Sequence, residues 1–303
     1  MKFLAEKNVS LNSKSVNLAA EFGFLEILKF LLDEEAPLES LYGTTALHIA
    51  AEKGHLKIVQ YLLKIEKCDD CLVVFYAAKG GDYDTLHFLL SRKKVYLDSC
   101  DSALNYIPLH IAIENGHVES VKLLVETGAD VNLAELRTGK TPLHVAAENG
   151  NLETVKFLLG KQVDVTAWSK YVGTPLDAAS ANGHLESVKI LFETQRSIEA
   201  ARSGFLSAAF KGHLDVVNYF LENRVNVDSR GVPKAINDPK GYCSIMDQGL
   251  RNETALYWAT KEGRLNVVKS LIEQGGDYKI KSGLYNYFFL TFLCFWIFQT
   301  LIR

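Results

Sequence analysis

A unit of about 33 residues recurs along most of this chain, and no other feature constrains the fold as strongly. Its clearest copy is residues 141–159, TPLHVAAENGNLETVKFLL. Close variants occupy residues 45–63, 107–124 and 174–191. One such unit cannot bury its own apolar side, whereas a stack of units forms a continuous core. The repetition therefore predicts a stack of similar elements.

Each copy carries a glycine at the same place, which gives the register of the whole array. The eight glycines are Gly23, Gly54, Gly81, Gly116, Gly150, Gly183, Gly212 and Gly263. Their spacing is 33 to 35 residues in the centre of the array and 51 residues between the last two. The four weaker copies centre on Gly23, Gly81, Gly212 and Gly263, so about eight units are expected.

The residue types in the clearest copy predict two short helices. Thr141 can accept a backbone N–H bond at a helix start, and Pro142 fits the first helical turn because its missing N–H is not needed there. Gly150 can end this helix in a left-handed conformation that other residues adopt at a cost. Apolar residues at helical spacing then follow in 152–159 and predict an amphipathic second helix.

The sequence resembles the ankyrin-repeat family over roughly nine-tenths of its length. The resemblance lies in the period, the T-P-L-H start and the order of the units. The resemblance implies an all-α solenoid of about eight helix-turn-helix repeats joined by hairpin loops. We expect this ankyrin-repeat domain to span residues 1–281. The first unit lacks the T-P-L-H start, which is common in terminal repeats because they cap the stack.

The longest glycine spacing contains about 18 residues more than one period. We place this insertion at residues 229–250, where prolines and glycines predict a loop. An insertion of this kind projects from one face of a solenoid and often contributes to binding, although a surface loop without a role is an equally simple interpretation.

The C-terminal residues 282–303 depart from the repeat pattern. Residues 282–302 are 21 uncharged and mostly apolar residues, flanked by Lys279, Lys281 and Arg303. As a helix they would reach about 31 Å, the thickness of a bilayer core. We therefore expect a hydrophobic C-terminal helix that spans a membrane once, with the repeats on the cytoplasmic side. Two other interpretations stay open: a tail that covers the last repeat as a cap, and a remnant without function.

Composition narrows the function classes. The net charge of the 303-residue chain is −3 and no basic stripe is present, so we do not expect nucleic-acid binding. Five sparse cysteines fit a reducing compartment, and the N-terminus lacks the apolar run of a signal peptide. We expect a cytoplasmic protein, anchored to a membrane where the tail spans it.

Candidate chemistry is weak throughout. His48, His110 and His144 recur once per repeat, and in the ankyrin-repeat family this histidine makes structural hydrogen bonds. Cys68 and Cys71 have half the ligand spacing of a zinc site, but a structural site needs four ligands. We expect no catalytic residue, metal or cofactor, and hence no enzyme.

The resemblance implies that protein partners bind at hairpin tips and along the row of first helices. Carried over by position, the tip residues are Thr44, Tyr106 and Lys140. The ends of the first helices supply Glu52, Lys53, Glu114, Asn115, Glu148, Asn149, Asn182, Phe210, Lys211, Lys261 and Glu262. Tyr106 and Phe210 are favoured because exposed aromatic residues contribute more binding energy than exposed charges.

The function that fits best is a scaffold that holds other proteins, tethered to a membrane by its tail. Two alternatives remain: a soluble ankyrin adaptor whose tail caps the stack, and a piece of the regulatory ankyrin domain of a larger membrane protein. The sequence does not identify the partner, because fold alone does not give function.

Overall fold

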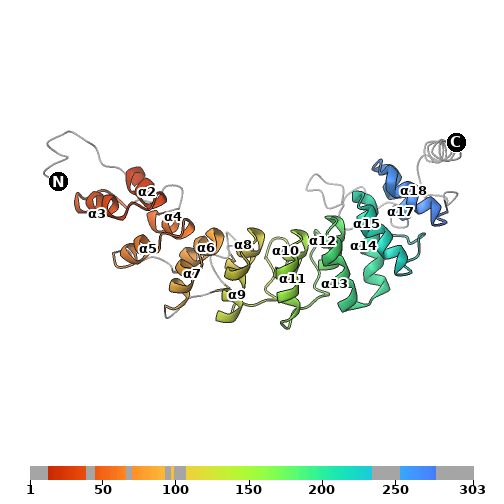
Figure 1. The fold of residues 1–303 in the computed structure, drawn as a ribbon, viewed down its shortest axis with the longest axis horizontal. Helices are drawn as coiled ribbons and strands as arrows, with labels where there is room; N and C mark the ends of the chain where they lie inside the picture. Colours follow the sequence, from red (N-terminus) through yellow and green to blue (C-terminus); the bar gives the residue numbers. More distant parts are fainter. Residues whose placement is uncertain are drawn as a thin grey trace. The chain divides into compact units, whose positions relative to one another are not determined.

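Sixteen α-helices form eight pairs in the computed structural model, which describes residues 13–38, 45–65, 70–92, 97–98, 107–233 and 253–277 (Figure 1). The chain forms two compact units, Met1–Arg137 and Thr138–Arg303. The described residues contain two isolated β-bridges and no strand. The predicted all-α stack of about eight helix pairs is confirmed for the part of the chain that is described.

Four pairs belong to the first unit. They are α2 (Ser13–Glu21) with α3 (Leu25–Asp33), α4 (Ala46–Glu52) with α5 (Leu56–Leu62), α6 (Asp70–Gly80) with α7 (Tyr83–Leu90), and α8 (Pro108–Glu114) with α9 (Val118–Thr127). The first helices stack in the order α2, α4, α6, α8, and α7 packs between α5 and α9 in the second row. Paired alanines such as Ala50 and Ala51 are fully buried, and their small side chains let neighbouring first helices approach closely.

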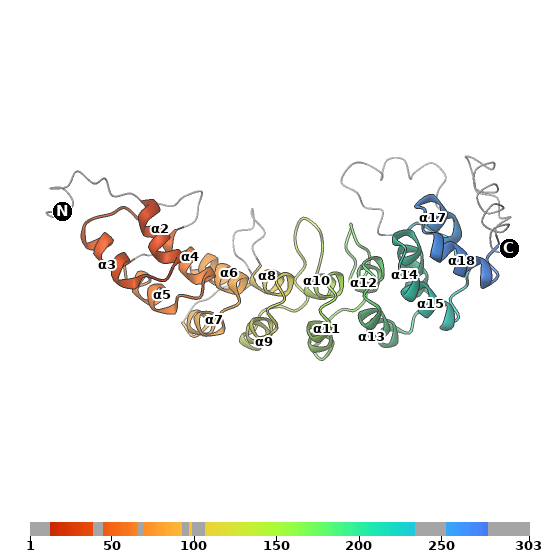
Figure 2. The same cartoon turned by 45° about the horizontal axis from the view of Figure 1, so that its top comes forward.

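Four pairs belong to the second unit. They are α10 (Pro142–Glu148) with α11 (Leu152–Leu159), α12 (Pro175–Ala181) with α13 (Leu185–Gln195), α14 (Ile198–Lys211) with α15 (Leu214–Glu222), and α17 (Ala255–Lys261) with α18 (Leu265–Glu273). The first helices again form one row and the second helices another. The segment that joins α11 to α12 extends beyond the row of first helices, as Figure 2 shows.

The T-P-L-H start begins α10 at the predicted place, and the histidine side chain binds the backbone of the threonine that precedes the helix. Thr141 is the N-cap of α10 and Pro142 its first residue. The Thr141 backbone N–H donates to Nδ1 of His144 over 3.1 Å, and Nε2 of His144 lies 2.9 Å from the carbonyl oxygen of Gly173. Burial lowers the pKa of His144, which favours the neutral ring with Nδ1 as acceptor and Nε2 as donor. The α10 helix ends at Glu148 with Asn149 as its C-cap, and Gly150 follows with φ +68°, so its predicted left-handed conformation is confirmed.

In five repeats the residue after the repeat glycine connects neighbouring repeats. Within the first unit, Nε2 of His55 and His117 lies 3.0 Å from the carbonyl oxygens of Glu21 and Lys79, each at or near the end of the preceding first helix. His184, His213 and Arg264 make the same kind of bond in the second unit. These contacts satisfy carbonyl groups that helix ends leave without an intrahelical partner. Asp82 and Asn151 differ, since each side chain caps its own helix by accepting a backbone N–H bond, from Thr85 and Thr154 respectively.

The two ends of the predicted insertion lie side by side. The structure describes its first residues as far as Pro233 and resumes at Glu253. The Gly231 N–H donates to the Glu253 carbonyl over 2.9 Å, and Arg230 forms an isolated bridge with Thr254. The chain therefore leaves and re-enters the stack through a closed neck, so the insertion does not interrupt the packing of α17 on α14. Residues 234–252 lie outside the described part.

The tail predicted to span a membrane, residues 282–302, also lies outside the described residues. Among the helices that are described, none is both long enough and apolar enough to cross a bilayer. The boundary between repeats and tail at residues 281 and 282 stays a prediction.

Candidate protein-binding surface

The predicted binding residues at the ends of the first helices are mostly accessible. The exposed ones are Lys53, Glu114, Asn115, Asn149, Asn182, Lys211, Lys261 and Glu262, and the half-buried ones are Glu52, Glu148 and Phe210. They occupy equivalent places on successive repeats because each follows the motif at a fixed distance. Of the three residues predicted at hairpin tips, Lys140 is half-buried, and Thr44 and Tyr106 lie outside the described residues.

Several of these residues form ion pairs. Lys53 lies 3.8 Å from Glu21, and Lys79 lies 3.0 Å from Glu52, so each pair joins neighbouring first helices of the first unit. In the second unit Lys140 pairs with Glu148. All of these side chains are at least partly solvated, and pairs of this kind contribute about 0–1 kcal/mol to stability. A partner can therefore exchange them for its own contacts at little cost.

Phe210 lies between a packing role and a binding role. The Phe210 ring makes an edge contact with the buried Trp258 at 6.0 Å between centroids. Nζ of Lys211 lies 5.7 Å from the centroid of the Phe210 ring. The backbone carbonyl of Phe210 accepts from Nε of Arg264. The Phe210 ring therefore contributes to packing inside the stack. The prediction that it binds a partner rests on the part of the half-buried ring that remains accessible.

The histidines at the motif position have structural surroundings. His48 and His144 accept backbone N–H bonds from Thr45 and Thr141, and His48 lies against Tyr76 at 5.1 Å between centroids. Asp177 occupies the same position in α12 and accepts from the Thr174 N–H over 2.9 Å. In the described part of the chain, no three His, Cys, Asp or Glu side chains group as metal ligands.

One accessible group of aromatic side chains was not predicted from the sequence. Trp168 and Tyr171 lie on the tip of the segment joining α11 to α12, and they are 57% and 40% exposed. Nζ of Lys170 lies 5.6 Å from the Tyr171 ring centroid. We call residues 167–173 the aromatic tip. The signal that could have found it is the placement of two aromatic residues in a polar loop directly before a T-P-L start.

The aromatic tip is held by hydrogen bonds on several sides. Ser169 and Gly173 exchange two backbone bonds of 2.8 and 3.0 Å, and the Ser169 hydroxyl donates to the carbonyl of Thr138 over 2.8 Å. The Gly173 carbonyl also accepts from His144 of α10. At the base, Thr166 donates twice to Asp164, which lowers the pKa of that carboxyl. The two rings are therefore presented on a fixed turn.

Comparisons with known proteins concern the repeats and their fold. The alpha-latrocrustotoxin-Lt1a of Latrodectus tredecimguttatus is 37% identical over 59 residues, which are 20% of this chain and 4% of the toxin. The match thus spans a small part of the toxin's length. The crystal structure of the human ASB11 ankyrin repeat domain superposes with a TM-score of 0.55 at 23% identity, covering 69% of this chain and 86% of that one, and this likeness concerns the fold alone.

The sequence model for ankyrin repeats in three copies matches residues 1–73, 74–168, 134–202 and 178–282. These matches cover the described helices of both units, including the weaker copies around Gly23 and Gly81. Repeats of this family typically serve as protein-interaction modules. The chain belongs to the ankyrin-repeat family.

Proposed function

We propose that this chain is a scaffold that binds another protein through its aromatic tip and the neighbouring ends of the first helices. The observation that carries the proposal is the pair of exposed rings, Trp168 and Tyr171, on a turn fixed by Ser169 and His144. Asn149 and Asn182, at the C-terminal ends of the first helices α10 and α12, add exposed polar groups. Membership of a family of interaction modules supports the same conclusion.

Energetics favour the aromatic tip over the charged row as the main contact. Tryptophan and tyrosine are enriched among the few residues that dominate binding energy, because they bury a large area with few rotatable bonds. A fixed turn loses little conformational entropy when a partner binds. Lysine and glutamate at the first-helix ends then contribute mainly to the rate of association and to specificity.

Replacing Trp168 by alanine is expected to weaken binding of a partner by about 30-fold or more, since removing such an anchor costs about 2 kcal/mol or more. The partner would be identified by affinity capture with the full chain, purified, and titrated directly by calorimetry. Tyr83→Ala is the matched control, because Tyr83 is an exposed ring on α7 in the first unit. Equal affinities of wild-type chain and Trp168→Ala for every directly bound protein would contradict the proposed site.

The finer part of the proposal is a membrane tether through residues 282–302. Its support is the length and composition of that segment, with Lys279 and Lys281 on the side of the repeats. The alternatives of a soluble adaptor with a capping tail, and of a piece of a larger membrane protein, predict different behaviour of the same segment.

A chain that ends at Lys281 separates these alternatives. We expect the full chain to remain with membranes after alkaline extraction and the shortened chain to be released. Release of both chains, with a lower melting temperature for the shortened one, would instead assign the tail to capping. Release of both chains with equal melting temperatures would show that the tail neither anchors nor caps the protein. The proposed membrane tether would then be wrong.

A further inference from the structure

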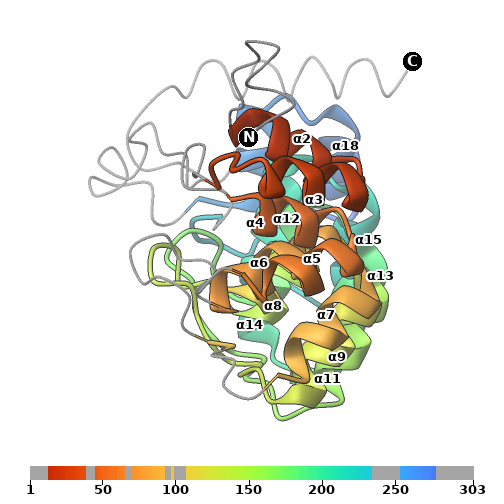
Figure 3. The ribbon, with the colours of Figure 1, turned by 90° about the vertical axis from the view of Figure 1, so that its left-hand side faces the viewer.

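One end of the first unit carries an accessible apolar surface on α2 and α3. Five large side chains there are between 44% and 61% exposed: Leu18, Phe22, Phe24, Ile27 and Phe30. We call this group the end face. Figure 3 views the first unit from its N-terminal side, with the helices α2 and α3 in front. The helices that contact α2 most are its partner α3 and the next first helix, α4, so the opposite side of α2 has no described helix against it.

The position of Ile27 shows that the end face is a stacking surface. Ile27 lies four residues after the repeat glycine and is 51% exposed. The residue at this place is 0–1% exposed in every described repeat that follows another within its unit: Ile58, Thr85, Ser120, Ser187, Val216 and Val267. The preceding repeat covers this position elsewhere, and an isoleucine in the first repeat leaves an apolar group where a neighbour would pack.

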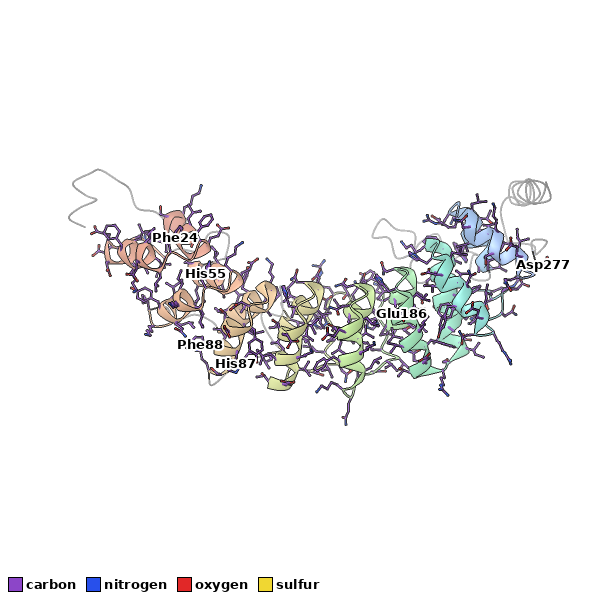
Figure 4. All side chains as sticks on the ribbon, viewed as in Figure 1. Phe24, His55, His87, Phe88, Glu186 and Asp277 are labelled. Carbon is purple, nitrogen blue, oxygen red and sulfur yellow. The ribbon has the colours of Figure 1, made fainter. Side chains whose placement is uncertain are left out.

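The position of Phe24 distinguishes the end face from an ordinary junction between repeats. Phe24 directly follows the repeat glycine, where His55 and four other residues donate to a carbonyl of the preceding first helix. Figure 4 labels Phe24 and His55, which occupy this same place in the first two repeats. The side chain of phenylalanine has no hydrogen-bond donor and cannot satisfy such a carbonyl. The end face is therefore better suited to pack against an apolar surface than against another repeat of the ordinary kind.

The exposed area suits contact with an equal surface. A large side chain presents about 150–250 Å² when fully accessible, and each of the five is roughly half exposed. The end face thus offers about 500 Å², the size of apolar patch that often marks an interaction site. Two copies would remove about 1,000 Å² from water, the lower limit for a specific interface. The nearby side chains Glu26 and Lys29 form an ion pair at 2.8 Å. Their charges cancel, so they leave no net charge that would repel an identical surface.

From these observations we infer that the end face is a self-association surface, where a second copy of this chain packs end face to end face. A two-fold axis would place Phe24 and Ile27 of both copies near its centre, with Phe22 stacked on Phe24 at 6.1 Å between centroids. The aromatic tip lies in the other unit, so this inference does not depend on the proposed partner site.

Sedimentation of the full chain in detergent, over a series of concentrations, tests the inference. The wild-type chain is expected to pass from monomer to dimer, and Ile27→Glu is expected to need at least tenfold more protein. Ile198→Glu is the matched control, because Ile198 is 63% exposed at the start of α14 in the second unit. All three chains keep the apolar tail, so association through the tail would be the same in each. Circular dichroism checks that the variants fold, and Phe24→Glu provides a second substitution of an exposed side chain.

Hydrogen exchange of α2 and α3 gives an independent readout. A dimer predicts that protection of these helices rises with protein concentration and falls in Ile27→Glu. A wild-type chain that stays monomeric, or an Ile27→Glu dimer as stable as wild type, would overturn the inference. Protection that is strong and independent of concentration would also overturn it, because the end face would then be covered by another part of the same chain.

Discussion

Replacing Trp258 by alanine is expected to lower the free energy of unfolding by about 4 kcal/mol, as large aromatic-to-alanine changes in cores do. Trp258 is fully buried in α17. Its ring contacts those of Phe210 and Tyr257, and its indole N–H donates to the Gly231 carbonyl over 2.9 Å. Burial also raises the pKa of the neighbouring, half-buried Tyr257.

The loss has a packing part and a hydrogen-bonding part, and two further variants separate them. Trp258→Phe keeps most of the ring but removes the N–H, so it should cost about 1–3 kcal/mol for the carbonyl left at Gly231. Trp168→Ala removes the same side chain from the exposed aromatic tip and should change stability by less than about 0.5 kcal/mol. Urea unfolding followed by circular dichroism measures all three, and hydrogen exchange shows whether the loss falls on α17 and α18. Equal effects of the two alanine variants would show that Trp258 does not hold this repeat in place.

Trp258 also shows where prediction from the sequence ends. It occupies the variable position of the motif, which in α4 and α8 holds the half-buried Ile49 and Ile111. The sequence places a helix here, because Thr254 and Gly263 mark its ends as they do in other repeats. The fully buried indole contacts Phe210 and Tyr257, and its N–H donates to the Gly231 carbonyl at the start of the insertion. A contact between residues 27 positions apart across an insertion follows from tertiary packing and not from the repeat pattern.

The repeated features of the fold were predictable because each has a local physical cause. Thr141, Pro142 and Gly150 define a helix by capping, by a preset φ and by a left-handed turn, and each acts within a few residues. The row of first-helix ends follows from the same register, which is why Asn149 and Asn182 could be placed in advance. Whether these residues bind a partner stays a prediction.

The aromatic tip was less predictable because loops do not follow the repeat register. The sequence-based choice of tip residues took the residue directly before each motif, such as Lys140, and Trp168 lies several positions before its motif. What makes the tip a candidate site is the set of bonds that fixes it, from Ser169 to Thr138 and from Gly173 to His144. These bonds join segments about 30 residues apart, and only the folded structure brings them together.

Replacing Gly183 by alanine is expected to destabilise the second unit by about 3 kcal/mol. Gly183 has φ +74°, and a left-handed conformation costs a residue with a Cβ about 1–2 kcal/mol. The added Cβ would also lie 2.3 Å from Nδ1 of His213, closer than side-chain atoms can approach. The ring would have to rotate away and give up its 3.0 Å bond to the Ala181 carbonyl, which leaves that carbonyl without its donor at a further cost of about 1–3 kcal/mol.

Gly263→Ala is the matched control for this change, because Gly263 has φ +68° and an added Cβ there would meet no atom within 4 Å. It should show the backbone cost of about 1–2 kcal/mol alone. The difference between the two variants in urea unfolding then measures the contact with His213. In a double-mutant cycle, Gly183→Ala in a His213→Ala background should cost no more than Gly263→Ala, since the clash and the bond are both already absent. If Gly183→Ala and Gly263→Ala cost the same in the wild-type background, the ring of His213 does not set the requirement for glycine at this position. The link between repeats would then rest on the helix contacts alone.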